Sequence, residues 1–210
     1  MIRLQALAYM IPPYTRIADI GCDHGYLIDL AFKQGLQYAQ AIDNKPLPLQ
    51  KAKENLNIYQ DKVTYSLSSG LNQLLPSIPC IVLAGLGGRL IVDLLNKDLD
   101  KLANVERIIT EPHKNIDQVR RFLSTHGYQI ASEQVIEEES IFYEIIVFEK
   151  GLAHYTDTEL LFGPLLMRHK DPLWIKKWQK IDEELSHNPH PMTNKKRELI
   201  HKHVPLGENQ

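Results

Sequence analysis

A chain of 210 residues is long enough for one domain and an additional segment, and its 43% hydrophobic content supplies a sizeable core. A net charge of −2 excludes a strongly basic nucleic-acid-binding protein, although a local basic patch would suffice to bind RNA. Cys22 and Cys80 are too few and too far apart for a disulfide framework, which favours a reducing compartment. We see neither a signal peptide nor a membrane-spanning apolar run, and expect a cytoplasmic protein.

The chain begins with a pattern that predicts a helix, a strand and a second helix. Apolar residues at helical spacing over residues 4–10 end at Pro12-Pro13, which stops a helix. Residues 17–20 form a short apolar run typical of a buried strand. A second helix is expected from Tyr26 to near Gly35, a fitting C-terminal glycine. The segment between this strand and this helix is a glycine turn.

The glycines of this turn, Gly21 and Gly25, are four residues apart. A dinucleotide fingerprint needs glycines at i, i+2 and i+5, and the carboxylate of Asp23 would oppose a pyrophosphate. A phosphate-binding loop would need Lys after its last glycine, but Tyr26 follows. The turn therefore favours an adenosine cofactor with a cationic, phosphate-free tail, such as S-adenosylmethionine. The alternative is a tight strand–helix turn that binds no ligand.

A second strand, over residues 39–43, ends in an acid. Asp43 lies 22 residues after Gly21, and an acid at that distance accepts hydrogen bonds from both ribose hydroxyls of a bound adenosine. The alternative is a surface acid at a strand end. Pro46 then opens a helix whose apolar face carries Leu49, Ala52 and Leu56.

Three further strands are expected over residues 63–67, 80–84 and 107–111, and the loops after them carry small or polar residues. Three glycines within residues 85–88 indicate positive φ or a very close approach by another group. The last two strands, 129–136 and 141–148, are joined by only four residues and must form an antiparallel hairpin. Strands that alternate with helices predict an α/β fold whose mostly parallel sheet is covered on both faces. Ligands of such sheets bind beyond the carboxyl ends of the strands.

The character of the chain changes after Gly151. Asp171-Pro172 starts a helix with Trp174 and Trp178 at helical spacing, residues 186–191 interrupt it, and a shorter helix over 194–203 follows. We expect the tryptophans to pack rather than to stack on bases, and the histidines in this segment lack the partners of a metal site, so no metal is expected. The expected domains are 1–151 and a small helical appendage, 152–210.

Several motifs resemble those of the bacterial tRNA (adenine-22-N1)-methyltransferases. They are residues 18–27 in the first glycine turn, 84–91 at the fourth strand, 142–146 in the last strand, and 163–165 with 176–178 in the C-terminal segment. The resemblance implies a Rossmann-like, seven-stranded methyltransferase sheet, S-adenosylmethionine as donor and tRNA as acceptor. Glu111-Pro112-His113 departs from the family's usual Gln-Pro-Asn, Ser69 replaces its usual acid, and the C-terminal segment is shorter than usual.

These arguments select candidate residues for each role. The candidate cofactor-binding residues are Asp19, Gly21, Cys22, Asp23, His24, Gly25, Asp43, Asn44, Ser69, Gly70, Ala84, Gly85 and Gly87. The catalytic candidates are Asp23, Glu111 and His113, because a carboxylate near the acceptor stabilises the cationic methylated ring. The candidate substrate-binding residues are Arg89, Pro112, His113, Lys114, Tyr143, Lys176 and Lys177, and further phosphate contacts are expected from Arg120, Arg121 and Lys180.

Two other functions remain open on the sequence alone. One is methyl transfer to a small molecule or a protein, which the modest pI and the short appendage allow. The other is a non-catalytic module that binds S-adenosylmethionine, which the altered segment Glu111-Pro112-His113 allows.

Overall fold

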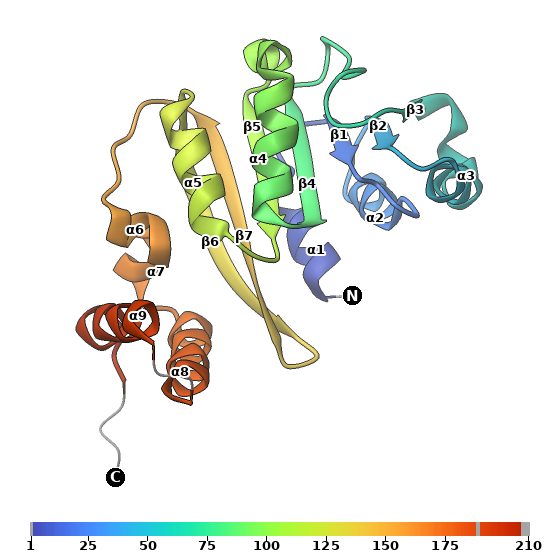
Figure 1. Ribbon diagram of the computed structural model, residues 1–210. Helices are drawn as coiled ribbons and strands as arrows, with labels where there is room; N and C mark the ends of the chain where they lie inside the picture. The colour runs from blue at the N-terminus through green and yellow to red at the C-terminus, as the bar shows by residue number, and fades with distance from the viewer. Residues whose placement is uncertain (1, 188–189, 207–210) are drawn as a thin grey trace.

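A single seven-stranded sheet forms the centre of the protein, as the computed structural model shows for residues 2–187 and 190–206 (Figure 1). The strands lie in the order β3-β2-β1-β4-β5-β7-β6, and all except β7 run parallel. This confirms the expected mixed sheet. The strands are β1 (Arg16–Ile20), β2 (Tyr38–Asp43), β3 (Val63–Leu67), β4 (Cys80–Leu86), β5 (Arg107–Pro112), β6 (Tyr128–Glu138) and β7 (Ile141–Lys150).

Helices cover both faces of the sheet because the strands at its centre are apolar on both sides. One apolar core joins the sheet to α1, α2 and α3, and the other joins the opposite face to α4 and α5. These helices are α1 (Ile2–Tyr9), α2 (Tyr26–Lys33), α3 (Pro46–Asn55), α4 (Gly88–Lys97) and α5 (Ile116–Thr125), with short 3-10 helices at Asn57–Lys62 and Leu99–Asn104.

The topology places a switch point at β1. The chain passes from β1 outward to β2 and β3, then returns to β4 on the other side of β1. The loops that leave β1 and β4 therefore diverge to opposite faces of the sheet and open a crevice beyond their carboxyl ends. Candidate residues at or just after the carboxyl ends of β1, β2, β3, β4 and β5 line this crevice.

The terminal hairpin is longer than the sequence predicts. β6 and β7 extend to Glu138 and Ile141, so only Glu139 and Ser140 form the turn, with φ of 52° and 62°. Two consecutive residues with positive φ make a tight hairpin turn whose twist matches that of the strands. Because β6 and β7 are long, the hairpin projects beyond the rest of the sheet (Figure 1).

The C-terminal segment packs against this hairpin. It consists of α6 (Asp157–Phe162), α7 (Pro164–His169), α8 (Pro172–Ser186) and α9 (Pro191–His203). The expected helical hairpin is α8 with α9, although α9 begins three residues earlier than predicted, and part of the expected break over 186–191 lies outside the described residues. Trp174 is fully buried and Trp178 nearly so, in an apolar cluster with Val135 of β6. The expectation that these tryptophans pack is confirmed.

Candidate active site

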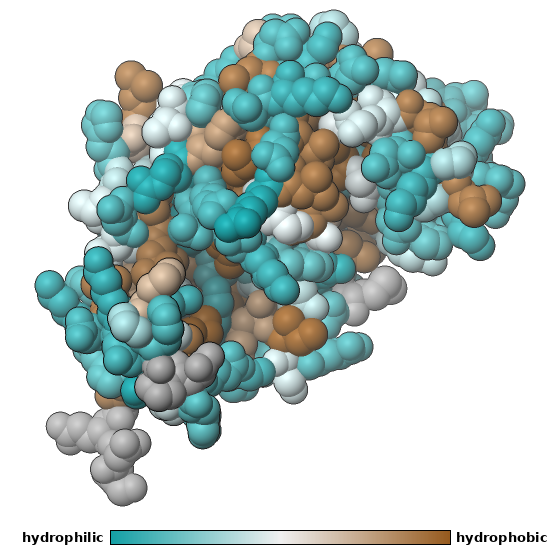
Figure 2. All heavy atoms as spheres, in the orientation of Figure 1, coloured by the Kyte–Doolittle hydropathy of each residue, from teal (hydrophilic) through white to brown (hydrophobic). Residues whose placement is uncertain are grey.

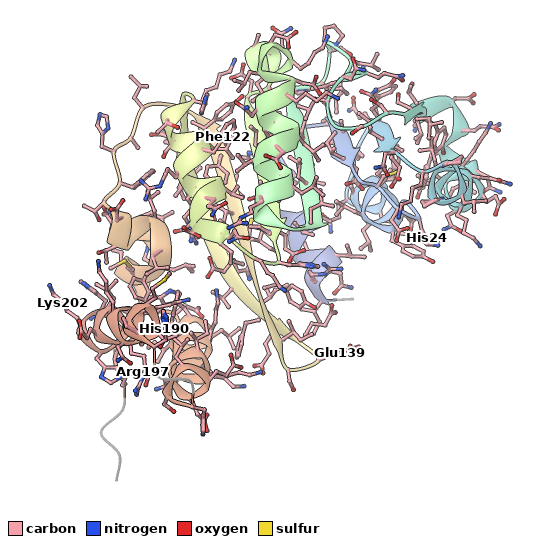
Figure 3. All side chains as sticks on the ribbon, viewed as in Figure 1. His24, Phe122, Glu139, His190, Arg197 and Lys202 are labelled. Atoms are coloured by element: carbon pink, nitrogen blue, oxygen red, sulfur yellow. The ribbon has the colours of Figure 1, made fainter. Side chains whose placement is uncertain are left out.

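A cavity of about 620 Å³ lies beyond the carboxyl ends of the central strands. This volume lies within the usual range for a small-molecule site. Eleven of the thirteen candidate cofactor-binding residues line this cavity. They are Asp19, Gly21, Cys22, Asp23, His24, Asp43, Asn44, Ser69, Gly70, Ala84 and Gly85. The first turn and Asp43 therefore share one crevice, as the sequence predicts. Figure 3 labels His24 near the start of α2.

The turn after β1 is held against β2 by backbone hydrogen bonds. The amides of Gly21 and Cys22 donate to the carbonyl oxygen of Ile42 at 2.8 and 3.0 Å. Gly21 has φ of +80°, a conformation that glycine adopts without strain. Asp23 also has a left-handed backbone, with φ of +46°, so its side chain is set at the rim by a backbone shape that few residues tolerate.

Asp43 links the ends of β1 and β2. Its Oδ2 accepts a hydrogen bond from the Asp23 amide at 3.2 Å, and its Oδ1 accepts one from the Lys45 amide at 2.9 Å. Each carboxylate oxygen has a second acceptor site, so both remain able to receive a hydroxyl. The carboxylate therefore holds the turn and also faces the cavity.

Negative charge is concentrated at the base of the cavity. Asp19 is only 4% exposed, and burial raises its pKa to about 7, helped by the nearby carboxylates of Asp43 and Asp23. The same burial and the same acids raise the pKa of the Cys22 thiol, which makes this cysteine an unreactive lining residue. A cationic ligand would relieve the repulsion between these carboxylates, whereas a pyrophosphate would increase it.

The loop after β3 adds a neutral polar group to the cavity wall. The Ser68 hydroxyl is buried, lines the cavity and has no hydrogen-bond partner among the described residues. Buried hydroxyls are seldom left unpaired, so this group is a candidate for binding a ligand. The loop is fixed from behind, where the Leu71 amide donates to Asp98 Oδ2 at 3.1 Å.

The segment Glu111-Pro112-His113, at the end of β5, differs from the expectation in one respect. Glu111 is fully buried and does not line the cavity, so direct contact between this carboxylate and an acceptor is wrong. Its Oε2 instead accepts hydrogen bonds from the Gly85 amide at 3.0 Å and from Arg3 Nη1 at 2.8 Å. Burial raises the pKa of Glu111, and the charges of Arg3 and His113 oppose that rise.

His113 is the part of this segment that reaches the cavity. Its side chain is 44% exposed, and its ring meets the edge of Tyr143, with the ring centroids 5.8 Å apart. Tyr143 and the buried Pro112 lie behind His113 and do not line the cavity themselves. Of these three candidate substrate-binding residues, His113 is therefore the one that forms the exposed surface of the cavity wall.

Two of the predicted cofactor residues, Gly25 and Gly87, do not line the cavity. A Cβ on Gly25 would lie 2.8 Å from a Leu56 side-chain carbon, so this glycine serves helix packing. Gly87 precedes α4 and has open space around it. Other lining residues were not predicted from the sequence, because most are apolar and the polar ones lie outside the glycine and acidic motifs. The missed residues are Arg3, Leu4, Ile20, Tyr26, Leu27, Lys45, Pro48, Ser68, Leu86, Leu90 and Leu94.

Two predicted phosphate contacts are buried ion-pair partners, which corrects the expectation. The guanidinium of Arg120 is fully buried and pairs with Glu133 at 2.8 Å and with Glu144. Lys177, 11% exposed in its side chain, pairs with the other oxygen of Glu144. A buried carboxylate between two cations is screened from tRNA, so Arg120 and Lys177 cannot meet its phosphates.

The remaining basic candidates lie on the surface. Arg89 and Lys114 are exposed close to the cavity wall. Lys176 is 60% exposed and pairs with Glu137 at 2.7 Å, Lys180 donates to the Ser140 carbonyl, and Arg121 pairs with Asp157. Hydrophilic side chains dominate the face of the C-terminal helices in Figure 2.

Two absences concern the described residues only. No helix among them combines the length and the apolar character that crossing a bilayer requires. Nor do residues 2–187 and 190–206 bring together three or more His, Cys, Asp or Glu side chains in an arrangement that would hold a metal ion.

Comparison with known proteins gives similarity over nearly the whole chain. The family described as TrmK, tRNA (adenine(22)-N(1))-methyltransferase, matches residues 17–205. The Bacillus subtilis (strain 168) tRNA (adenine(22)-N(1))-methyltransferase is 31% identical over 212 residues, which cover 93% of this chain and 89% of that protein. The crystal structure of Streptococcus pneumoniae Sp1610 in complex with S-adenosyl-L-methionine is 33% identical with a TM-score of 0.92, over 97% of this chain and 99% of that chain. TrmK of M. capricolum, in complex with S-adenosyl-homocysteine, is 26% identical with a TM-score of 0.84, over 96% of both chains.

Proposed function

The chain belongs to the tRNA (adenine(22)-N(1))-methyltransferase family, and from this premise we propose that it transfers a methyl group from S-adenosylmethionine to N1 of adenine 22 in tRNA. The observation that carries the proposal is the single cavity that unites the first glycine turn with Asp43 at the switch point of the sheet. A relative with this fold binds S-adenosyl-L-methionine.

The residues of the cavity fit this cofactor. Asp43 has free acceptor sites for ribose hydroxyls, and the buried, unpartnered Ser68 hydroxyl is available to the adenine end. Asp19, whose pKa is raised among acids, favours a positively charged tail. When bound there, S-adenosylmethionine supplies a methyl group already activated by the sulfonium charge.

The chain's own residues then have to position the acceptor and exclude water. N1 of adenine has a free lone pair, so no general base is required before it attacks. The methylated ring is cationic, and the Asp23 carboxylate at the rim is the group that stabilises it. Asp23 is 67% exposed and is oriented by His24 Nδ1 at 2.7 Å. His113 supplies the wall against which the base lies, and Tyr143 supports it.

The tRNA backbone is proposed to contact exposed cations near the cavity and on α8. Arg89 and Lys114 flank the acceptor side, and Lys176 extends the basic surface to the C-terminal helices. Phosphate contacts of this kind set the register of the RNA without reading its sequence. A tRNA substrate also fits a cytoplasmic location, as the composition suggests.

A direct test is incubation of the protein with labelled S-adenosylmethionine and an unmodified tRNA that carries adenine at position 22. We expect label in the tRNA and a reverse-transcription stop at position 22, because a methyl group on N1 blocks base pairing. The same tRNA with guanine at position 22 is the matched control and should stay unlabelled. Cofactor binding without transfer would support the alternative binding module, and transfer to other molecules alone would support the alternative acceptor class.

A further inference from the structure

Arg3 joins three parts of the acceptor wall that come from different elements. The first turn of α1 carries it, and the Ile2 amide anchors this turn by donating to Glu138 Oε1 on β6 at 2.6 Å. Arg3 Nη1 lies 2.8 Å from Glu111 Oε2 and 3.3 Å from His113 Nε2, and its Cζ lies 5.1 Å from the centroid of the Tyr143 ring. A planar guanidinium can pair with an acid and lie over a ring at once, which an ammonium does poorly.

Glu111 transmits this contact to the cavity. The oxygen that pairs with Arg3 also accepts the Gly85 amide at 3.0 Å, and Gly85, with φ of +73°, lines the cavity. The other oxygen, Oε1, is buried without a hydrogen bond from a described residue and lies 3.4 Å from His113 Nε2. One buried carboxylate thus holds both the β4 backbone at Gly85 and the His113 ring, and its own charge depends on Arg3.

We propose that Arg3 is a positioning residue for methyl transfer, which fixes the Glu111 carboxylate and through it holds Gly85 and His113 in the wall that receives the target base. This inference rests on the proposed function and adds a residue to it. Arg3 acts from the N-terminal helix, which carries none of the glycine motifs of the cofactor turn.

The charged and titratable groups around Glu111 determine how the rate of transfer depends on pH. They are Arg3 from α1 and His113 from the end of β5, with Tyr143 of β7 packed on both, while β4 contributes only the Gly85 amide. Removal of Arg3 leaves the buried carboxylate without its main cation, so the carboxylate takes up a proton at a higher pH. As the pH is lowered, the rate of transfer should therefore decrease at a higher pH than in the wild type.

The experiment compares Arg3→Met with Arg107→Met. Arg107 is a matched control because it pairs with Glu149 at 2.5 Å and lies over the Tyr14 ring at 5.0 Å, but sits at the opposite end of β5. Calorimetry measures S-adenosylmethionine affinity, and single-turnover transfer to unmodified tRNA is followed from pH 5.5 to 9. We expect Arg3→Met to keep the cofactor Kd within threefold and to slow transfer at least 30-fold at pH 7. The acid limb of its pH–rate profile, where the rate falls as the pH falls, should shift up by at least one pH unit. Arg107→Met should leave the acid limb where it is.

Two further variants protect the test from a folding defect. Arg3→Lys keeps the charge but not the flat contact with Tyr143, so transfer should slow about fivefold to tenfold with an unmoved acid limb. Arg3→Met combined with Glu111→Gln removes the buried charge, so the double variant should be faster than Arg3→Met below pH 7. Transfer at the wild-type rate in both Arg3 variants, or a loss in Arg3→Met with an unmoved acid limb, would overturn the inference while leaving the proposed function intact. Absence of transfer by the wild type would overturn both.

Discussion

Asp43 accepts a hydrogen bond from the backbone amide of Asp23, with 3.2 Å between Oδ2 and the nitrogen, so the acid that ends β2 holds the turn that follows β1. The two residues belong to separate βα units and meet only because β1 and β2 are neighbours in register, with Ile20 opposite Ile42. One carboxylate thus holds the turn after β1 and keeps further acceptor sites, which we propose receive the ribose hydroxyls of the cofactor.

Asp43→Ala should weaken S-adenosylmethionine binding by about 30-fold or more, because it removes the proposed ribose acceptor and releases the turn, each worth about 1 kcal/mol or more. Asp43→Asn keeps one acceptor oxygen and should lose less affinity for S-adenosylmethionine than Asp43→Ala. Calorimetry gives the Kd of each variant. Asp29→Asn on α2 is the control, since Asp29 pairs with Lys33 away from the cavity. Wild-type affinity in Asp43→Ala would remove Asp43 from the site.

Asp19 is expected to make the cofactor-free protein less stable at alkaline pH. Its pKa is raised from the ordinary 3.8 of an aspartate to about 7 in the fold, so ionising it costs folding free energy as the pH rises through this interval. Asp19→Asn should therefore raise the free energy of unfolding at pH 8, by at most about 4 kcal/mol, and change it little near pH 4. Urea denaturation of the cofactor-free protein measures the free energy of unfolding at both pH values. Asp100→Asn is the control, because the Asp100 side chain is 80% exposed. Equal stabilisation at both pH values would show that the charge is not the cause.

The same raised pKa predicts how cofactor affinity depends on pH. A cation bound beside Asp19 favours the ionised carboxylate, so binding releases a proton and the Kd falls as the pH rises from 5.5 to 8. Calorimetry in two buffers of different ionisation enthalpy detects that proton. In Asp19→Asn the release should disappear. Its persistence there would assign the proton to another group.

Asp23 should matter for transfer more than for cofactor binding. Asp23→Ala is expected to keep the S-adenosylmethionine Kd within tenfold and to slow transfer to tRNA by about 100-fold, since it removes the carboxylate proposed to stabilise the cationic product ring. Asp23→Asn is the matched variant, because Asn tolerates the left-handed backbone at φ +46° but carries no charge. Both should be slow in single-turnover assays. An active Asp23→Asn would show that the backbone shape, not the charge, is required.

The sequence predicted most of the sheet because its strands are buried on both faces and appear as short, continuous apolar runs. The location of the site followed from topology alone, since parallel strands bring their carboxyl ends to one edge. What local patterns could not show is which charges pair across the fold. Arg120 and Lys177 look like surface cations, but their partner Glu144 lies 24 and 33 positions away on a strand. Glu111 was misjudged in the same way, because its partner Arg3 is 108 positions away.

No local apolar pattern predicts α6, and α7 is indicated only by the resemblance of residues 163–165 to the start of the family's C-terminal helices. Each has only six residues, too few for a periodic apolar pattern to be distinguished from a loop. They form because they pack against α5 and β6, contacts that a local pattern does not contain. The capping box between Thr156 and Glu159 is the one local signal that marks the start of α6.

Gly87 and Gly88, at the start of α4, are expected to respond differently to the same substitution. A Cβ on Gly88 would lie 2.4 Å from the Asn115 carbonyl oxygen and 2.5 Å from that of Lys114, whereas one on Gly87 would meet nothing within 4 Å. Gly88→Ala should therefore lower the free energy of unfolding by about 3 kcal/mol or more, because backbone atoms must move. Gly87→Ala should cost at most about 1 kcal/mol, as alanine is a poor N-cap. Thermal and urea denaturation compare the two, and equal costs would contradict the close approach.

Adjacent lysines on α8 provide the last prediction. Lys177 and Arg120 neutralise the buried Glu144, whereas Lys176 makes a surface pair with Glu137. Lys177→Met should destabilise the protein by about 3–5 kcal/mol, since it leaves a buried carboxylate short of a partner. Lys176→Met should cost about 1 kcal/mol or less, because an exposed ion pair contributes little. Urea denaturation at pH 7 measures both.

Two additional measurements separate this structural role from a tRNA contact. Combining Lys177→Met with Glu144→Gln removes the uncompensated charge and should recover part of the lost stability, as coupled residues do in a double-mutant cycle. Lys176→Met should instead lower tRNA affinity and reduce its dependence on salt, because each phosphate contact contributes to that slope. Additive losses in the double variant would place Lys177 outside the buried network. An unchanged salt slope in Lys176→Met would take this face of α8 out of the proposed tRNA surface.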